Sequence, residues 1–349
     1  MQKNAYIKEE MKMKPEILFL KQEDLIKAGL LDMPLILEAA EHTYKMLGEG
    51  KVIQPAKIQL PIPDKKNWTS YGMSMPAYIG GDEEVMGFKW AAESVYNTTL
   101  PGVPYGIDIV ILSEPKTMFP KAVLDGTITT AMRTSACAGV FAKYCADPDS
   151  EVVTLVGAGV IGRTMIMAMG AVLKNIKEIR LFDLDMTKAE SLAEEFKGQY
   201  NIVPAADLKN ACEGADIVVT ETTARKPFID GAWIRQNATC IQMEAYSFPE
   251  EFLLKNDALY MDSWEQISHM RESVKKYAEA GKLHETDVIE IKDLCTGAAP
   301  GRTNKDQFIF CTSMGMGCVD IAIANKLYLK AKEIGVGTKL SLWDDPLWV

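Results

Sequence analysis

Three glycines with a regular spacing, Gly157-x-Gly159-x-x-Gly162, stand between an apolar run and a segment of helical period in VVTLVGAGVIGRTMIMAMGAVLK, residues 152–174. The first glycine permits a tight turn out of a strand, and the second lets the backbone approach a pyrophosphate. The third lets the following helix pack against the strand. The pyrophosphate would bind at the start of that helix, where backbone N–H groups lack partners. The spacing and its context therefore predict a dinucleotide site, whose backbone ligands would include Val160 and Ile161.

Asp183 indicates which dinucleotide binds. It lies about 20 residues after Gly162, at the end of a second apolar run, where a carboxylate accepts hydrogen bonds from the ribose hydroxyls of adenosine. The same charge repels a 2′-phosphate, so we expect NAD rather than NADP. Arg163 is the nearby cation that could reverse this preference. The alternative is a glycine-rich turn that binds no ligand.

Two cations, Lys89 and Arg133, stand in apolar surroundings. Lys89 follows an apolar run in GFKWAAES, and Arg133 lies within the small-residue segment ITTAMRTSACAGVFAKYCA. A buried charge must be paired or bind an anion, and a nicotinamide enzyme needs groups that orient its substrate, because the cofactor supplies the hydride chemistry. The alternatives are an interdomain ion pair for Arg133 and a solvated strand end for Lys89.

The composition excludes several other classes of function. The chain has 349 residues and a net charge of −10, without a basic block, so we expect neither nucleic acid nor a membrane as partner. Its three histidines are far apart and its seven cysteines form no CxxC pair, so no metal site is expected. Scattered, unpaired cysteines and the lack of a signal-peptide core favour the cytoplasm.

The elements that must position these residues fall into two groups. Residues 52–125 contain short strand-like runs broken by Pro, Gly and Asp, typical of an antiparallel or mixed sheet. From residue 152 onward strands and helices alternate, which predicts a doubly wound parallel sheet of the Rossmann type. One of its helices is expected over 263–281. Ligands should bind outside the carboxyl ends of the parallel strands, in the cleft between domains.

We therefore predict an α/β protein with an α+β domain for substrate binding and dimerisation at 1–126, an NAD-binding domain at 127–315, and a C-terminal helix, 316–349, that returns to the first domain. Aromatic residues such as Trp68, Tyr71 and Tyr78 would leave apolar surface in the first domain, which indicates a homodimer.

A succession of short motifs covering nearly the whole chain resembles the ornithine cyclodeaminase/mu-crystallin family. The motifs are Pro55-x-Lys57, Gly87-Phe88-Lys89, Thr130-x-x-Arg133-Thr134, the glycine turn at Gly157, Thr312-Ser313-x-Gly315 and Asp320. The resemblance implies an NAD(P)-binding domain, a homodimer paired through the first domain, and amino or imino acid substrates held by their carboxylate.

The resemblance also assigns roles to residues. Lys89 is similar to a lysine that contacts the substrate carboxylate, and Arg133 to an arginine that bridges this carboxylate and the cofactor. Lys57 stands where many members have arginine, which keeps the charge but loses the bidentate fork. The residues implied to border the nicotinamide end of the cofactor are Thr222, Gln242, Met243 and Ser313.

Two departures bear on the reaction. Ser247 stands where cyclodeaminating members carry an aspartate, and Met73 where they tend to have a glutamate. A hydroxyl is a weaker base than a carboxylate, although Glu244 or Glu93 could supply a substitute. The resemblance thus favours an NAD-dependent imino acid reductase or amino acid dehydrogenase, with Lys89, Arg133 and Ser247 as catalytic residues. The alternatives are an ornithine or lysine cyclodeaminase, which releases ammonia and recycles NAD, and a non-catalytic binding protein of the mu-crystallin kind.

Overall fold

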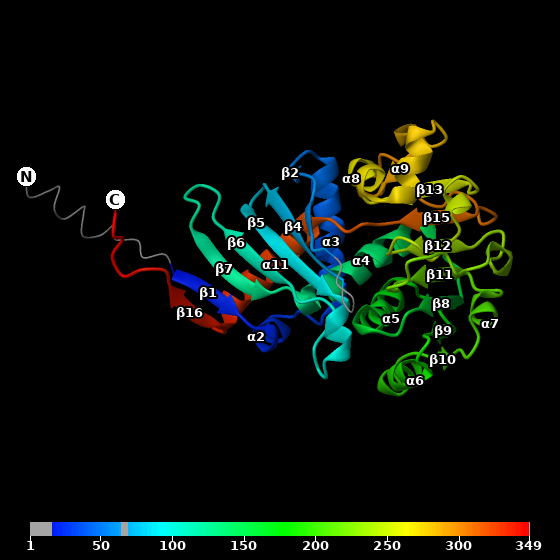
Figure 1. Ribbon diagram of the computed structural model, residues 1–349, viewed down its shortest axis with the longest axis horizontal. Helices are drawn as coiled ribbons and strands as arrows, with labels where there is room; N and C mark the ends of the chain where they lie inside the picture. Colours follow the sequence, from blue (N-terminus) through cyan, green and yellow to red (C-terminus); the bar gives the residue numbers. More distant parts are fainter. Residues whose placement is uncertain (1–15, 64–68, 349) are drawn as a thin grey trace, which may run out of the picture.

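A computed structural model describes residues 16–63 and 69–348. Two sheets of eight strands form its two ends. Helix α3 (Met33–Gly48) runs between them, and Figure 1 shows α4 (Thr127–Cys145) leading from the first sheet toward the second. Almost every residue of α4 after its first turn is buried, because its small side chains let neighbouring elements approach it from all sides.

The first sheet is mixed, as expected. Its strand order is β16-β1-β7-β6-β5-β4-β2, with β3 also paired to β4, and only the β1–β7 pair is parallel. Helix α2 (Gln22–Lys27) follows the first strand, and the short helix η1 (Val95–Thr99) follows β5. The strands are β1 (Glu16–Leu20), β2 (Val52–Ile53), β3 (Ile58–Pro61), β4 (Ser70–Ile79), β5 (Val85–Ser94), β6 (Ile109–Ser113), β7 (Pro120–Asp125) and β16 (Thr338–Ser341).

The C-terminal segment adds more than a helix to this sheet. Helix α11 (Gly317–Ile334) returns to pack against β4 and β5, in agreement with the sequence. A β-carbon at Gly317 would lie 2.8 Å from the carbonyl oxygen of Met75, so glycine allows the helix to begin in direct contact with β4. The chain then forms the edge strand β16, which the sequence analysis missed because TKLS is exposed at every residue and has no apolar alternation.

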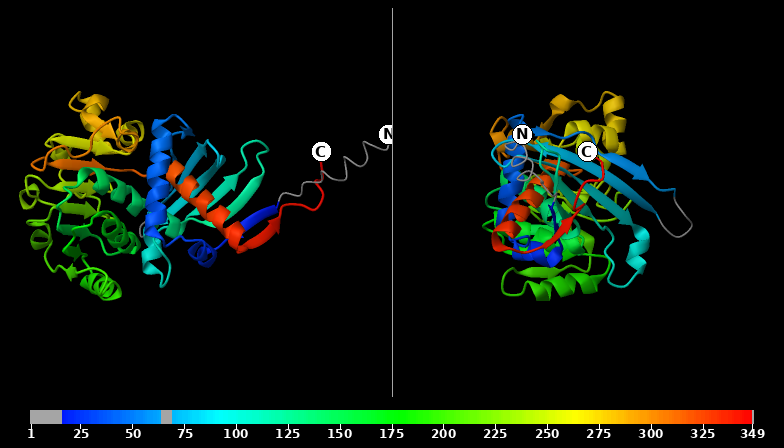
Figure 2. Two further views of the ribbon diagram at one scale, coloured as in Figure 1. Left: turned by 180° about the vertical axis from the view of Figure 1, so that it is seen from behind. Right: turned by 90° about the vertical axis from the view of Figure 1, so that its left-hand side faces the viewer.

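The two faces of the first sheet differ in character. Lys89 pairs in register with Met75 on one side and Val110 on the other, and this row faces the protein interior. The neighbouring row, which faces the other way, contains Trp90 and Ile109. Among the described residues, the exposed apolar side chains of this second face include a central group and two outlying residues, Ile53 and Phe19. The central group is Ile58, Leu60, Trp90 and Ile109, with Ile107 just before β6. Figure 2 shows α11 against one side of this sheet, and the second face is the side that α11 does not cover.

Of the two tyrosines named above, Tyr78 lies in the row of that face, opposite Ile53, whereas Tyr71 lies in the inward-facing row. Tyr71 and Tyr78 are half-buried, and their hydroxyl groups donate to Glu93 and Glu84. Trp68 lies outside the described residues. The exposed apolar surface of that face comes mainly from isoleucine, leucine and Trp90, because these side chains alternate with the inward-facing ones along the strands.

The second sheet is wholly parallel and confirms the doubly wound fold. Its order is β10-β9-β8-β11-β12-β15-β13-β14, so the chain reverses its direction of winding between β8 and β11. The strands are β8 (Val152–Val156), β9 (Glu178–Phe182), β10 (Ile202–Pro204), β11 (Ile217–Thr220), β12 (Thr239–Gln242), β13 (Ala258–Met261), β14 (Val288–Glu290) and β15 (Ile309–Thr312). Their covering helices are α5 (Val160–Val172), α6 (Met186–Glu195), α7 (Leu208–Cys212), α8 (Trp264–Met270), α9 (Glu272–Glu279) and α10 (Ile291–Thr296), with short helices η2 (Gly231–Trp233), η3 (Glu250–Leu253) and η4 (Glu285–Asp287).

One expected helix is two. The segment 263–281 breaks at Arg271, whose backbone is extended (φ −93°, ψ 112°) and separates α8 from α9. The Arg271 side chain turns inward, where it donates to Thr312 and to the carbonyl oxygen of Ser313. The backbone of Arg271 still bonds to both helices, because its N–H donates to the carbonyl oxygen of Ile267 and its own carbonyl oxygen accepts from the N–H of Lys275. The side-chain contacts attach this break to the end of β15.

Candidate active site

The glycine turn has the shape that a pyrophosphate requires. Gly157 adopts a left-handed backbone (φ 120°) directly after β8. A β-carbon on Gly162 would lie 2.1 Å from the carbonyl oxygen of Gly157, whereas one on Gly159 would meet nothing within 4 Å. Gly159 caps α5 without a side-chain hydrogen bond. The first N–H groups of this helix, at Val160 and Ile161, are thus available to an anion.

Asp183 lies against the same turn. Its carboxylate accepts hydrogen bonds from the backbone N–H groups of Ala158, at 2.8 Å, and Asp185, at 2.9 Å. The next side chain, Leu184, is 97% exposed. Arg163 points toward α6, where its guanidinium pairs with Glu195 at 2.7 Å. The cation that could have attracted a 2′-phosphate already has an acidic partner, so the residues fit NAD.

The residues expected at the nicotinamide end gather at the carboxyl ends of neighbouring strands. Gln242 ends β12 and Ser313 follows β15, both buried, with Met243 beside them. Thr222 follows β11, and its hydroxyl lies 3.4 Å from that of the buried Ser247. Because all the strands are parallel, these residues share one edge of the sheet with the glycine turn.

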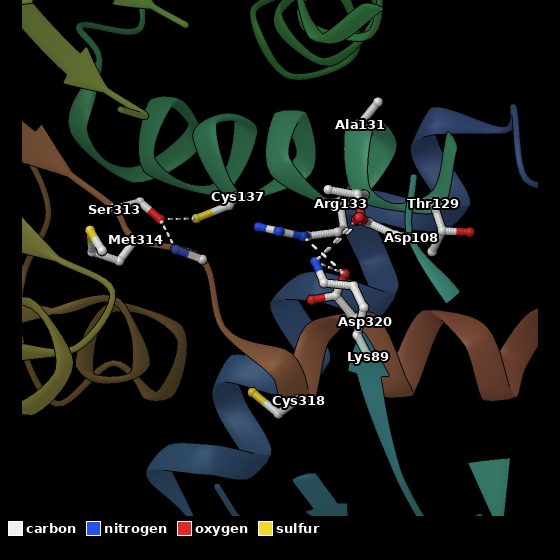
Figure 3. Close-up of polar contacts among 12 residues, drawn as sticks. Lys89, Asp108, Thr129, Ala131, Arg133, Cys137, Ser313, Met314, Cys318 and Asp320 are labelled. Carbon is white, nitrogen blue, oxygen red and sulfur yellow. Dashed lines mark hydrogen bonds and ion pairs between the residues drawn. The ribbon is translucent and has the colours of Figure 1, made fainter. Parts of the chain in front are cut away.

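Lys89 and Arg133 meet at one buried carboxylate, that of Asp320 (Figure 3). Lys89 is 1% exposed, and its Nζ lies 3.0 Å from Asp320 Oδ1, 3.2 Å from Thr130 Oγ1 and 3.8 Å from Asp108 Oδ2. Arg133 Nε donates to the same Asp320 Oδ1 at 3.1 Å. The alternative of a solvated strand end for Lys89 is therefore wrong, whereas Arg133 does form an ion pair between segments distant in sequence.

Lys57 adds a third cation. Its Nζ donates to the carbonyl oxygen of Met314. Burial lowers the pKa of Lys57 to about 7; Asp262 opposes this effect, and the positive charges of Arg133 and Lys89 add to it. Burial, together with the charge of Arg133, also lowers the pKa of Lys89. The three cations thus lie within range of one another, in a place where a further anion would be stabilised.

A turn after β15 connects the cations to the nucleotide-binding sheet. Asp262 Oδ2 accepts hydrogen bonds from Ser313 Oγ at 2.6 Å, Met314 N at 3.0 Å and Gly315 N at 2.7 Å. A β-carbon on Gly315 (φ 74°) would lie 2.2 Å from Arg133 Nη1. Only glycine lets this turn lie against the guanidinium, which explains the Ser-x-Gly motif.

Two carboxyl groups at the ends of β11 and β12 have opposite environments. Glu244 accepts hydrogen bonds from Thr220 Oγ1 at 2.8 Å, Tyr246 N at 2.6 Å and Ser247 N at 3.2 Å. Glu221 Oε2 is buried and has no hydrogen-bond partner in the part of the chain that the structure describes. Burial first, and the charge of Glu244 second, raise the pKa of Glu221 well above its usual range.

Sequence reasoning missed several of these residues. Asp108, Asp262, Glu221 and Arg271 were not singled out, and Asp320 entered only as part of a motif. Asp108 offered a signal, because an acid inside the apolar run GIDIVIL needs a buried cation as its partner. Within residues 16–63 and 69–348, no group of three or more His, Cys, Asp or Glu residues could hold a metal ion. No helix there is long and apolar enough to cross a membrane.

Comparison with known proteins extends this picture. Residues 18–335 match the sequence model of the Ornithine cyclodeaminase/mu-crystallin family. The chain is 25% identical to the N-((2S)-2-amino-2-carboxyethyl)-L-glutamate dehydrogenase of Staphylococcus aureus over 336 residues, which cover 95% of this chain and all of the relative.

Two solved structures have the same fold over nearly their full length. One is the Delta(1)-pyrroline-2-carboxylate reductase of Thermococcus litoralis in complex with NADH and L-proline, at a TM-score of 0.83 and 30% identity, covering 93% of this chain and 100% of that one. The other is an archaeal alanine dehydrogenase dimer with bound NAD, at a TM-score of 0.82 and 26% identity, covering 94% of this chain and 100% of that one.

Proposed function

We propose a reaction for this chain, which belongs to the ornithine cyclodeaminase/mu-crystallin family and is an NAD-dependent oxidoreductase of amino or imino acids. It reduces the C=N bond of an imino acid and oxidises the matching amino acid. Lys57, Lys89 and Arg133 hold the substrate carboxylate. The observation that carries the proposal is the convergence of these cations beside the Ser313–Gly315 turn, which follows strand β15 of the nucleotide-binding sheet.

The charges of the site favour an anionic substrate. Asp320 and Asp108 are the acids that face Lys89 directly, and Asp320 also pairs with Arg133. Asp262 acts in the same way on Lys57. Because the three cations converge from different elements, a substrate carboxylate bound among them would accept hydrogen bonds from more than one of them. Charge-assisted hydrogen bonds to such an anion contribute about 1.5–3 kcal/mol each.

The remaining residues position the cofactor. The amides at the start of α5 would bind the pyrophosphate and Asp183 the adenosine ribose, while Thr222, Gln242, Met243 and Ser313 would border the nicotinamide. When bound, NAD accepts or supplies the hydride. Arg133 lies between the carboxylate site and the Ser313–Gly315 turn, so it would orient the substrate relative to that ring.

We favour net oxidoreduction over ammonia-releasing cyclisation. Ser247 is buried, and its backbone N–H is held by Glu244. Its hydroxyl has only the hydroxyl of Thr222 within 3.5 Å among the described side chains. Met73 leaves the other expected carboxylate position apolar. The site therefore lacks both acids that would handle a second amine.

One assay tests this proposal. NADH is mixed with a cyclic imino acid such as Δ1-pyrroline-2-carboxylate, and with 2-oxo acids plus ammonia, while nicotinamide absorbance is followed. We expect net loss of NADH with at least one of these substrates. Ammonia release from ornithine or lysine without any net absorbance change would instead establish a cyclodeaminase. Tight NADH binding without either reaction would favour a binding protein.

We further propose a division of labour along the chain. Residues 1–126 and 316–349 would bind substrate and pair two subunits, and residues 127–315 would bind NAD. The exposed face formed by Ile58, Leu60, Trp90, Ile107 and Ile109 is the proposed dimer interface, because a soluble monomer rarely exposes a contiguous apolar patch of this kind. We also propose a cytoplasmic location, which suits seven unpaired cysteines.

Light scattering tests the interface. Ile109→Asp should convert a dimer to a monomer at micromolar concentration, because it places a charge in the centre of the apolar face. Leu254→Asp is the matched control, since Leu254 is similarly exposed but lies in the NAD-binding half. A wild-type monomer, or a dimer that Ile109→Asp leaves intact, would contradict the assignment.

A further inference from the structure

Glu221 occupies the point where the winding of the parallel sheet reverses. It follows β11 directly and precedes Thr222. Its carbonyl oxygen would lie 2.2 Å from a β-carbon on Gly157, so the backbone of Glu221 is fixed against the turn that ends β8. In doubly wound sheets the ligand binds in the crevice between these two strands. Rigid elements therefore place the backbone of Glu221 at the cofactor crevice, and the charges of Arg133, Glu93 and Glu244 act on its carboxyl group.

This carboxyl group is not used by the structure itself. Its Oε2 atom is buried and unpartnered within residues 16–63 and 69–348, and a buried polar atom without a partner is costly. Glu244, by contrast, accepts three hydrogen bonds that fix the loop carrying Ser247. One carboxyl group thus stabilises the fold, and the other is left without a structural role.

From this placement we propose, on the basis of the function proposed above, that Glu221 is the acid that donates a proton to the substrate nitrogen as the C=N bond is reduced.

The charges that face Glu221 come from three elements. Glu244 follows β12, Glu93 belongs to β5, and Arg133 belongs to α4. The two acids disfavour a carboxylate at Glu221 and Arg133 favours one, but burial is the largest effect, so the pKa is raised. A carboxyl group whose charged form is disfavoured in this way can hold a proton for transfer to a substrate.

The step is balanced without any further reactant. The imine carbon gains the hydride, and the nitrogen forms an N–H bond as the O–H bond of Glu221 breaks, which leaves a carboxylate. Water then returns a proton to Glu221. In the direction of amine oxidation, the carboxylate takes the proton from nitrogen. Glu221 would supply the proton transfer that neither Ser247 nor Met73 can provide.

Infrared spectroscopy tests the protonation of Glu221 without cofactor or turnover. The cofactor-free enzyme at neutral pH should show the C=O stretching band of a protonated carboxylic acid, and Glu221→Gln should remove it. Glu213→Gln is the matched control, because Glu213 is an exposed acid that precedes the opposite end of β11. Absence of this band, or a band that persists in Glu221→Gln, overturns the inference.

Kinetics at saturating substrate test its role. Glu221→Gln should lower kcat for imine reduction by about 10²–10⁴-fold, with the Kd for NADH changed less than threefold. Wild-type kcat should fall as the pH rises through the pKa of Glu221, whereas the glutamine variant should show a low and flat profile. Glu221→Asp should recover part of the activity, and Glu213→Gln all of it.

The outcomes separate this inference from the proposed function. An active wild type together with a Glu221→Gln variant that keeps kcat within threefold overturns the role of Glu221 alone. If kcat then depends on Lys57, whose pKa is about 7, the ammonium of Lys57 is the proton donor. If the wild type fails to oxidise NADH with every imino or oxo acid tried, the proposed function is overturned. The infrared band still reports the protonation of Glu221 in that case.

Discussion

The proposed cofactor half and the proposed substrate half of the site are built in different ways. The glycine turn, the first turn of α5 and Asp183 come from one continuous segment, residues 157–183, and would bind the cofactor mainly through backbone groups. The cation cluster joins Lys57, Lys89, Arg133 and Asp320, and Lys89 is 231 residues from Asp320. One half is formed by residues that are close in sequence, and the other forms only when the chain is folded.

The difference has energetic consequences. The glycine turn has no room for side chains, and it leaves backbone N–H groups available to the ligand. Each of these two features is needed for ligand binding by itself. The cation cluster holds two buried positive charges at one oxygen atom, Asp320 Oδ1. A change in the first half should therefore alter cofactor binding with little loss of stability, whereas a change in the second should affect stability and substrate binding together.

The largest effect should come from removing Asp320. Asp320→Ala leaves Lys89 and Arg133 buried without their shared anion, and we expect it to lower the free energy of unfolding by about 3–5 kcal/mol. Urea denaturation measures this. Asp185→Ala, which removes an exposed helix cap in the cofactor half, should cost about 1 kcal/mol. Equal costs for the two variants would show that the halves do not differ in this way.

Removing a cation should separate substrate binding from cofactor binding. Lys89→Ala should lower kcat/KM by on the order of 10²-fold or more, because it deletes a charge-assisted hydrogen bond to the carboxylate. The Kd for NADH should be nearly unchanged in Lys89→Ala but higher in Arg133→Ala, since Arg133 contacts the turn beside the nicotinamide residues. Full activity of Lys89→Ala on carboxylated substrates would contradict the proposed anchor.

Removing Asp183 should change the choice of cofactor. Asp183→Ala deletes the charge that repels a 2′-phosphate, and we expect the ratio of Kd values for NADP and NAD to fall by on the order of 10²-fold. Fluorescence titration of both reduced cofactors measures this ratio. Asp185→Ala serves again as control, and its ratio should stay near that of the wild type. Tighter binding of NADP by the wild-type protein would show that our interpretation of Asp183 is wrong.

The smallest effect should be a change in pH dependence. The pKa of Lys57 is lowered to about 7, so its positive charge is lost as the pH rises through 7, and KM for a carboxylate substrate should rise. From pH 6 to 9 we expect about a tenfold increase. Lys57→Arg remains charged and should flatten this profile. An unchanged profile in Lys57→Arg would place the titrating group elsewhere.

The same contrast explains how much could be predicted from the sequence. The parallel sheet, the glycine turn and Asp183 were predictable, because backbone geometry at Gly157 and Gly162 demands glycine within one short segment. The roles of Asp320 and Asp262 were not predictable, because the role of a buried acid depends on the partners that the fold brings next to it. The break at Arg271 was hidden for the same reason, since its partners lie on β15.

Strand β16 and Glu221 show a further limit. An exposed strand such as TKLS carries no periodic signal, since its pairing with β1 depends on backbone groups and one exposed ion pair, Lys339–Glu16. Glu221 stands in a run of threonines, VVTETTA, where a single acid suggests a solvated loop. Only the packing around it reveals that one carboxyl oxygen is buried without a partner.

The position of Asp320 also orders events during synthesis on the ribosome. Lys89 emerges first, and its anion follows 231 residues later, which at 5–20 residues per second is a delay of about 10 to 50 s. During that interval the first sheet lacks both α11 and the shared carboxylate, so the lysine and the arginine must stay hydrated. The nascent chain can complete its cofactor segment, including Asp183, well before it can close its substrate pocket. Closure of the cation cluster therefore waits for α11, long after the cofactor segment has left the ribosome.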